Sequence, residues 1–378
     1  MAIVHERFTE LGGSERVVSE LCRLWPDSQV LVPIADPAVI RAAGLEGRVQ
    51  AGLPKVAYRG GPRYAHLLPL LPLAMSRLEL VDFDLIVTSH HAFANQINPP
   101  PWVPVVSYTH SPARWMWDPS TRSGEMGGRL GAAALAAFAT SQRGADRRAA
   151  RRLTGVMANS RAVAERIRRW WGRDSLLVPP PVDTDFFQPD DGVSRGDFFL
   201  LAGRLVPYKR PELAVAAAAA AGVPLVVAGE GRHRAACEAV AGPDTEFLGA
   251  VSSTRLRDLY RECRALVFPG VEDFGIVPVE AQACGAPVLA LRAGGVLDSV
   301  IDGETGHLVD AGPDAVVIER FAETMRTTDL AALDPTRARE NADYFSIPAF
   351  HERFTSGIAQ LLGDDCPAQT PFARDHRS

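Results

Sequence analysis

The sequence predicts an α/β protein made of two Rossmann-like domains whose parallel sheets face each other across a cleft. Short apolar segments alternate with helical segments in both halves of the chain, which is typical of parallel sheets with right-handed crossovers. One proline-stiffened and then polar segment, residues 179–196, separates the two halves. The chain of 378 residues, 47% of them hydrophobic, is long enough to bury two cores.

The first half is expected to open with an apolar strand at residues 2–4 and a loop that contains a Gly-Gly pair. Residues 14–25 then predict an amphipathic helix, because their apolar side chains recur on one face. Three further buried strands are expected at 84–89, 105–108 and 155–158. Each of these strands leads into a polar loop, as the strands of a parallel sheet do.

The second half repeats this pattern with a cleaner periodicity. Strands are expected at 198–202, 224–228, 246–248, 265–268 and 287–291. Helices are expected between them at 211–221, 232–240, 253–261 and 277–284. We therefore divide the chain into a first domain of residues 1–186 with a returning helix at 347–362, a second domain of residues 187–346, and a disordered tail at 363–378.

The composition argues against several classes of protein. A net charge of −5 is not typical of general nucleic-acid binding. The apolar stretch 131–139 is too short and too rich in alanine to span a bilayer, and the first residues lack the pattern of a signal peptide. Five dispersed cysteines without short paired spacings indicate reduced thiols rather than a disulfide framework or a zinc site. These features favour a cytoplasmic protein.

Two carboxylates flank a Phe-Gly turn in the second half. Glu272 is expected in the loop that follows the strand at 265–268, and Glu280 about one turn into the next helix. Ligands of open α/β sheets bind beyond the carboxyl ends of the strands, where this loop lies. Taken singly, Glu272 could be a surface carboxylate, and Glu280 an acid favoured by the helix macrodipole.

An anion site is expected next to these acids. The backbone N–H groups of Gly275, Ile276 and Val277 point out of the N-terminus of the predicted helix, where anions bind. Acids beside an anion site suit a ligand that carries both hydroxyl groups and phosphates. A sugar nucleotide fits that description.

Two cations follow the strand at 198–202. Arg204 and Lys209 are five positions apart across a turn, so both can converge on one point, as neutralisation of a diphosphate requires. The alternative is a pair of solvated surface charges. The neighbouring anion site favours a role in binding.

The strand ends of the first half carry weaker candidates. Gly12 and Gly13 precede a helix and could form only a tight turn, although their amides could also approach a phosphate or a sugar. His110 follows the strand at 105–108, where a histidine either binds a ligand or serves as a capping or packing group. The loop of the preceding strand carries three further candidates: Ser89, His90 and His91.

Other motifs are incomplete or ambiguous. Gly229 and Gly231 follow a strand, but the third glycine of a dinucleotide fingerprint is missing, which argues against an oxidoreductase. A P-loop, a metal-ligand cluster and a nucleophile elbow are also missing from the sequence. Residues 143–173 hold ten arginines with Trp170 and Trp171. This segment is either a solvated face with core tryptophans or a patch that rests on an anionic membrane.

Taken together, these residues resemble the retaining glycosyltransferases of family 4, which have the GT-B fold. The resemblance covers nearly the whole chain and rests on Glu-Asp-Phe-Gly-Ile-Val-Pro-Val-Glu at 272–280 and Gly-Arg-Leu-x-x-x-Lys at 203–209. It implies that the first domain binds the acceptor and that the second binds the sugar nucleotide.

The resemblance also implies roles for individual residues. Glu272 would grip hydroxyls of the donor sugar, and Glu280 would bind the ribose of the nucleotide. Arg204 and Lys209 would hold the diphosphate, so that neither a bound metal nor another cofactor is needed. Three residues of the first half match the family's loop and histidine near the anomeric carbon: Gly12, Gly13 and His110.

Segments 66–73, 84–91 and 110–118 resemble a subgroup of bacterial O-antigen and polysaccharide mannosyltransferases, whose donor is usually GDP-mannose. The resemblance implies retaining transfer of a hexosyl group to a glycan or lipid-linked acceptor in cell-surface polysaccharide synthesis, with peripheral membrane contact and no nucleic-acid partner. The chain departs from the family at its short first strand and at Asp298, where many relatives carry glutamate.

Three other functions stay open. The chain could be an epimerase or hydrolase of sugar nucleotides with the GT-B fold. It could use a UDP-sugar on a secondary-metabolite acceptor. It could also bind a sugar nucleotide without turning it over.

Overall fold

The computed structural model describes residues 1–52, 67–122 and 128–363, so His66 and residues 364–378 of the expected tail lie outside the described residues. The chain divides into two compact units, Met1–Pro181 with Phe350–Ser378, and Val182–Ala349. In the described residues each unit contains one sheet, and every pairing between its strands is parallel. The predicted fold class, two α/β units with parallel sheets, is confirmed.

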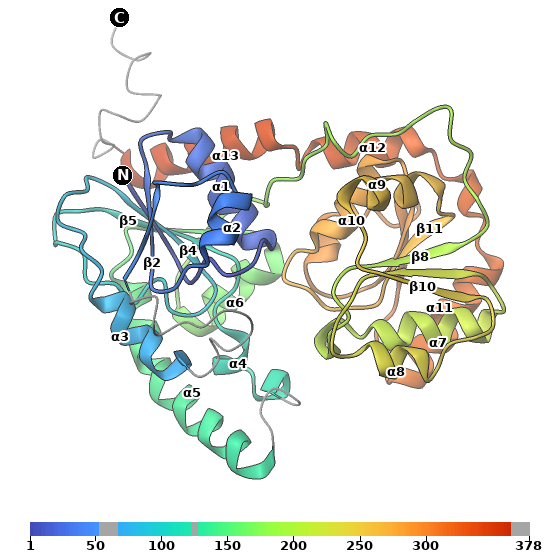
Figure 1. The fold of residues 1–378 in the computed structure, drawn as a ribbon, viewed down its shortest axis with the longest axis horizontal. Helices are drawn as coiled ribbons and strands as arrows, with labels where there is room; N and C mark the ends of the chain where they lie inside the picture. The colour runs from blue at the N-terminus through green and yellow to red at the C-terminus, as the bar shows by residue number, and fades with distance from the viewer. Residues whose placement is uncertain (53–66, 123–127, 364–378) are drawn as a thin grey trace, which may run out of the picture. The chain divides into compact units, whose positions relative to one another are not determined.

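The first unit is built on a seven-stranded sheet in the order β3-β2-β1-β4-β5-β6-β7. Figure 1 labels β2, β4 and β5 of this sheet. Its strands are β1 (Ala2–His5), β2 (Gln29–Val32), β3 (Val49–Ala51), β4 (Ile86–His90), β5 (Val105–Thr109), β6 (Gly155–Ala158) and β7 (Leu176–Leu177). Its helices are α1 (Gly13–Leu24), α2 (Pro37–Ala42), α3 (Leu71–Ser76), α4 (Arg114–Trp117), α5 (Gly128–Arg151), α6 (Arg161–Trp171) and, from Phe350 onwards, α13 (Ile347–Leu362).

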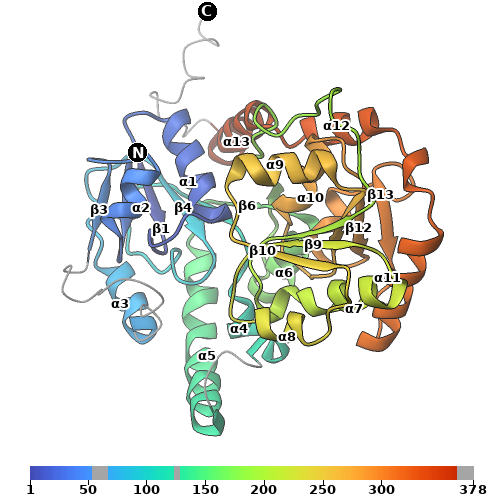
Figure 2. The ribbon, with the colours of Figure 1, turned by 45° about the vertical axis from the view of Figure 1, so that its right-hand side comes forward.

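The second unit has a six-stranded sheet in the order β10-β9-β8-β11-β12-β13. Its strands are β8 (Phe199–Ala202), β9 (Leu225–Ala228), β10 (Thr245–Gly249), β11 (Ala265–Phe268), β12 (Val288–Leu291) and β13 (Gly306–Val309). Its helices are α7 (Pro211–Ala221), α8 (Arg234–Glu238), α9 (Ser253–Glu262), α10 (Ile276–Ala283), α11 (Asp314–Thr327) and α12 (Pro335–Asp343). In Figure 2, α7 and α11 lie side by side along one face of the sheet.

Successive strand residues supply two separate cores in each unit, because side chains alternate between the two faces of a sheet. In the first unit, Ile3 and Val87 pack on the side of α1 and α13, whereas Val4 and Ile86 pack on the side of α5 and α6. In the second unit, alternate residues of β8 and β11 pack towards α9 and α10 or towards α7. Strands buried on both faces explain the continuous apolar runs in the sequence.

Most elements expected in the second half lie within two residues of the predicted bounds, and α7 and β11 coincide with them. The elements that were not predicted include the edge strands β3, β7 and β13 and the helices α11 and α12. The apolar stretch 131–139 lies within α5. None of the helices in the described residues has the length and the hydropathy that a membrane span requires.

Helix α13 closes one face of the first sheet although it comes last in the sequence (Figure 1). Phe354 is fully buried, and its ring centroid lies 5.6 Å from that of Trp25 and 5.8 Å from that of Tyr108. The first unit is therefore completed by a segment that follows the whole second unit.

We expect Phe354→Ala to lower the free energy of unfolding of the first unit by about 3–5 kcal/mol, because it leaves a cavity in this aromatic cluster. All six tryptophans lie in the first half of the chain, so urea denaturation followed by tryptophan fluorescence reports on this unit. Gln360→Ala, at an exposed position of the same helix, is the control. Equal stability of the two variants would contradict the docking role of α13.

Candidate active site

The strand order of the second sheet reverses between β8 and β11. The chain leaves β8 towards β9 on one side and leaves β11 towards β12 on the other side. The loops after these two strands therefore diverge and leave a crevice at the carboxyl edge of the sheet, where ligands bind in open α/β folds. One loop carries Arg204 and Lys209, and the other carries Glu272.

Lys209 and Glu272 meet in this crevice. Lys209 Nζ lies 2.8 Å from Glu272 Oε1, and each side chain is 19% exposed. The contact is an ion pair whose angles do not suit a hydrogen bond. Both residues line a small pocket together with Arg204, which is exposed and lies within 3.4 Å of the Tyr208 hydroxyl. The structure thus brings together three of the residues predicted from the sequence.

Glycines pack the loop after β8 against its neighbours. A Cβ atom at Gly229 would lie 1.9 Å from the carbonyl oxygen of Gly203, and one at Gly231 would lie 2.1 Å from that of Leu205. This close approach of the backbones explains why glycines stand at positions 229 and 231, which in the sequence resemble part of a nucleotide fingerprint.

Gly270 makes a similar contact with the end of the same loop. A Cβ atom at this position would lie 2.8 Å from the carbonyl oxygen of Lys209. A side chain there would push Lys209 away from the loop that carries Glu272.

The loop after β11 is fixed by contacts that also exclude side chains. Gly275 precedes α10 in a left-handed conformation, with φ of 89°, which glycine adopts without strain. Gly295 donates its backbone N–H to the carbonyl oxygen of Glu272 at 2.9 Å. A Cβ atom at Gly295 would lie 2.2 Å from the Cα atom of Phe274. The loop therefore approaches the Gly294–Asp298 turn as closely as backbone atoms allow.

The first backbone N–H groups of α10 lie at the end of this loop, where a helix has no internal acceptor for them. They belong to Gly275, Ile276 and Val277, which follow the pocket residue Glu272 by three to five positions in the sequence. This N-terminus favours an anion. Its part in ligand binding stays a prediction.

Glu280 lies in different surroundings from Glu272. Its side chain is buried, and its Oε2 accepts a hydrogen bond from the hydroxyl of Tyr260 at 3.1 Å. Burial, with the neighbouring carboxylate of Glu280, raises the pKa of Tyr260 well above its usual value, so the phenol keeps its proton. Glu280 is not among the residues that line the pocket. Tyr260 was not predicted, because its contact with Glu280 joins two separate helices.

In the first unit, His110 immediately follows β5. Its Nε2 lies 2.8 Å from the hydroxyl oxygen of Ser89, at the end of β4. Ser89 also lies 3.0 Å from Nδ1 of His5, which is bonded through Nε2 to Glu15. His5 and Glu15 were not predicted as site residues, although a glutamate three residues after Gly12 has the spacing of a capping interaction.

The Gly-Gly loop is tied to the same group of residues. Gly12 donates its backbone N–H to Glu15 Oε2 at 3.0 Å. That amide therefore has a partner within the fold, in contrast to the expectation that it is available to a phosphate or a sugar. Gly13 is the first residue of α1 and is exposed.

His90 and His91 are held by partners within the first unit. Oε1 of Glu6 accepts the backbone N–H groups of residues 91–94 at 2.7–3.2 Å and fixes the loop after β4. His91 Nε2 accepts a hydrogen bond from Arg7 at 3.0 Å, and burial lowers the pKa of His91 well below its usual value. His90 is fully buried, with a ring nitrogen 3.7 Å from Glu6.

The tryptophans near the arginine-rich segment pack inside the first unit. Trp117 and Trp171 each donate the indole N–H to the buried carboxylate of Asp146 at 2.7 Å, and Trp170 stacks on Trp117. Arg147 and Arg173 donate to backbone carbonyls. These contacts support the interpretation of a solvated face with core tryptophans. Contact with a membrane, like the cytoplasmic location, stays a prediction.

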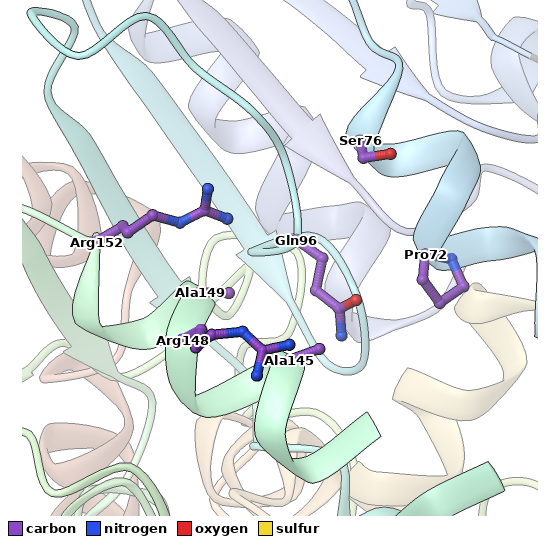
Figure 3. Close-up of a pocket in the computed structure, with 7 residues that line it drawn as sticks. All are labelled: Pro72, Ser76, Gln96, Ala145, Arg148, Ala149 and Arg152. Carbon is purple, nitrogen blue, oxygen red and sulfur yellow. The ribbon is translucent and has the colours of Figure 1, made fainter. Parts of the chain in front are cut away.

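A second cavity of about 280 Å³ lies between α3 and α5 (Figure 3). Its lining residues are Pro72, Ser76, Gln96, Ala145, Arg148, Ala149 and Arg152. Neither the predicted site residues nor the His110 group contribute to it.

We expect Gly295→Ala to displace the loop that carries Glu272 and to lower the free energy of unfolding by about 1–3 kcal/mol, because the added methyl group overlaps the backbone of residues 273 and 274. Urea denaturation followed by circular dichroism measures the loss. In the control variant, Gly312→Ala, the added atom has no neighbour closer than 3.6 Å. A Gly295→Ala variant as stable as the control would contradict the close packing.

Two family matches cover successive parts of the chain. Residues 11–186 match the family described as Glycosyltransferase Family 4, and residues 184–342 match Glycosyl transferases group 1. Similar curated proteins include D-inositol 3-phosphate glycosyltransferase 2 of Catenulispora acidiphila, 33% identical over 42% of this chain and 44% of its own length. The D-inositol 3-phosphate glycosyltransferase of Acidothermus cellulolyticus is 34% identical over 35% and 36%. This chain therefore spans less than half the length of these relatives.

Solved structures with the same fold align over almost the whole chain. Anabaena HepE in complex with UDP-glucose has a TM-score of 0.68 at 18% identity, and the alignment covers 95% of this chain and 99% of that one. Sucrose-phosphate synthase from Thermosynechococcus elongatus has a TM-score of 0.68 at 18% identity, with 96% and 100% covered. These likenesses show the GT-B fold. The two family matches, which together cover residues 11–342, show that this chain belongs to glycosyltransferase family 4.

Proposed function

We propose that the protein is a retaining glycosyltransferase that transfers a hexosyl group from a nucleotide-diphosphate sugar to a hydroxyl of a glycan or lipid-linked acceptor. The observation that carries the proposal is the ion pair of Lys209 and Glu272 beside Arg204, in the crevice between β8 and β11. This arrangement offers cations for a diphosphate and a carboxylate for sugar hydroxyls in one small pocket.

The cations act on the leaving group. When the glycosidic C–O bond breaks, negative charge builds up on the β-phosphate, and positive charge develops on the sugar. Lys209 has three N–H donors, so it can keep its contact with Glu272 while it also bonds a phosphate oxygen. Arg204 and the N–H groups at the start of α10 add further donors. Charge neutralisation by these groups supports transfer without a metal ion.

Retention of configuration follows if the acceptor attacks from the side of the leaving group and gives its proton to the departing phosphate. Glu272 is paired with Lys209, and it would bind hydroxyls of the sugar rather than attack the anomeric carbon. Binding of the ribose by Glu280 remains part of the proposal. It requires the nucleotide to reach a carboxylate that is bonded to Tyr260 in this structure.

The candidate donors and acceptors come from the resemblance in sequence and from the names of similar proteins. The resemblance to mannosyltransferases favours GDP-mannose, whereas the HepE structures contain UDP and UDP-glucose. The curated relatives are named for D-inositol 3-phosphate, which is therefore the first soluble acceptor to test. Thermal-shift screening with GDP-mannose, UDP-glucose and UDP-GlcNAc identifies the donor, because a ligand that binds the folded state raises the melting temperature.

With the donor identified, we expect Lys209→Ala and Glu272→Ala each to lower transfer on the order of 10²-fold or more, because each removes a preorganised electrostatic contact. Initial rates are measured with purified protein, the donor and a panel of acceptors. Arg337→Ala and Glu304→Ala, which break an exposed ion pair of 3.0 Å elsewhere on the second unit, are the controls. Transfer at wild-type rates by both site variants would rule out the assignment. Release of free sugar without transfer would favour a hydrolase.

A further inference from the structure

The carboxylate of Glu280 is held by a tyrosine from another helix of the second unit. Glu280 is 4% exposed in α10, and its Oε2 lies 3.1 Å from the hydroxyl oxygen of Tyr260 in α9. Burial and the negative charge of Glu280 raise the pKa of Tyr260 well above its usual value. The phenol therefore keeps its proton near pH 7 and donates a hydrogen bond to the carboxylate.

Tyr260 is itself fixed by its neighbours. Its side chain is fully buried, and its ring centroid lies 5.8 Å from that of Phe187. The guanidinium group of Arg195 donates to the backbone carbonyl of Tyr260 at 3.1 Å and to that of Cys284, directly after α10, at 3.1 Å. Arg195 therefore links the end of α9 to the end of α10. The positions of the phenol and the carboxylate are thus set by packing as well as by their own hydrogen bond.

The place of Glu280 in its helix suits a nucleotide. Ile276, which offers one of the first N–H groups of α10, precedes Glu280 by four positions, or about 6 Å along the helix axis. Residues four positions apart lie on the same face of a helix. A diphosphate at the N-terminus of α10 would therefore bring the ribose that it carries close to Glu280.

The hydroxyl of Tyr260 restricts how this carboxylate can turn. The last torsion of a glutamate side chain is broad, so a carboxylate without such a bond is free to rotate. A carboxylate has about four acceptor positions on its two oxygens, and the bond from Tyr260 takes up only one of them. We propose that Tyr260 is a positioning residue that holds the carboxylate of Glu280 in the orientation that binds the ribose hydroxyls of a nucleotide. This inference rests on the proposed function, in which Glu280 binds the ribose.

A second tyrosine provides a matched control. Tyr108, in β5 of the first unit, is also fully buried, and its hydroxyl has no hydrogen-bond partner among the described residues. Tyr260→Phe and Tyr108→Phe therefore make the same chemical change, but only the first removes a hydrogen bond. Both variants keep the buried ring, so we expect both to fold, which their melting temperatures check.

Calorimetric titration with UDP, GDP and their dideoxy analogues, which lack both ribose hydroxyls, tests the proposal. We expect the wild type to bind one ribonucleotide at least about 10-fold more tightly than its dideoxy analogue, because hydrogen bonds to a charged group are strong. Tyr260→Phe should weaken binding of this ribonucleotide about 5-fold, as expected for one lost hydrogen bond. Its affinity for the dideoxy analogue should stay within about 2-fold of the wild-type value, because groups without a shared partner act independently. Tyr108→Phe should bind both ligands as the wild type does.

Donor kinetics give a second readout. Tyr260→Phe should raise the KM of the donor by the same factor as it weakens binding of the ribonucleotide. Its kcat should stay near the wild-type value, because the ribose contact is made equally in the ground state and in the transition state. A loosened fold would lower kcat as well.

The outcomes separate the role of Tyr260 from the proposed function. A wild type that binds neither ribonucleotide, or that binds the dideoxy analogue equally well, overturns the proposed ribose contact and the role of Tyr260 with it. A wild type with the expected preference, retained in full by Tyr260→Phe, overturns the role of Tyr260 alone. Equal losses of affinity for both ligands in Tyr260→Phe, or the same loss in Tyr108→Phe, would indicate a general structural effect and overturn it too.

Discussion

Close contact between backbone segments holds the charged groups of the second unit in place. Gly229, Gly231 and Gly270 let the loop after β8 lie against its neighbours at distances that no Cβ atom tolerates. Gly295 does the same for the loop that carries Glu272. Because both loops are fixed through their backbones, little backbone freedom is lost when Lys209 and Glu272 meet. A preorganised pair of this kind is better suited to electrostatic stabilisation than a mobile one.

The same topology governs both units. In the first sheet the strand order reverses between β1 and β4, and hydrogen bonds join His5 and Ser89, at the carboxyl ends of these two strands, to His110 after β5. In the second sheet the reversal between β8 and β11 places the cations opposite the glutamate. Each unit thus places polar groups at the point where its loops diverge, which is where ligands of open parallel sheets bind. The two groups differ in chemistry: the first is a buried set of hydrogen bonds that includes the carboxylate of Glu15, and the second is a partly exposed ion pair.

The sequence predicted those parts of the protein that local patterns determine. Strands such as β11 are continuous apolar runs, and α7 begins at a proline and ends before Gly222, so both could be located from the sequence. The loops that carry Arg204, Lys209 and Glu272 come directly after two strands of this kind, β8 and β11. Edge strands such as β7, with only two residues, carry too little pattern to be recognised.

Contacts between distant segments could not be predicted in this way. Glu280 has the expected place in α10, but its bond to Tyr260 depends on how α9 and α10 pack. His5 and Glu15 acquire their importance from Ser89, which is more than 70 residues away. In the sequence, Gly229 and Gly231 resemble part of a nucleotide-binding motif. In the structure, they are explained by their close contacts with the loop after β8.

We expect the crevice between β8 and β11 to bind a nucleotide diphosphate through Arg204, Lys209 and the first N–H groups of α10. A crystal structure of the protein with GDP or UDP, the diphosphate product of its donor, would show whether it does. We expect the phosphate oxygens to lie within hydrogen-bonding distance of Lys209 Nζ and of the backbone N–H groups of Gly275–Val277. A nucleotide bound elsewhere, with the pair of Lys209 and Glu272 undisturbed and its pocket empty, would contradict this role of the crevice.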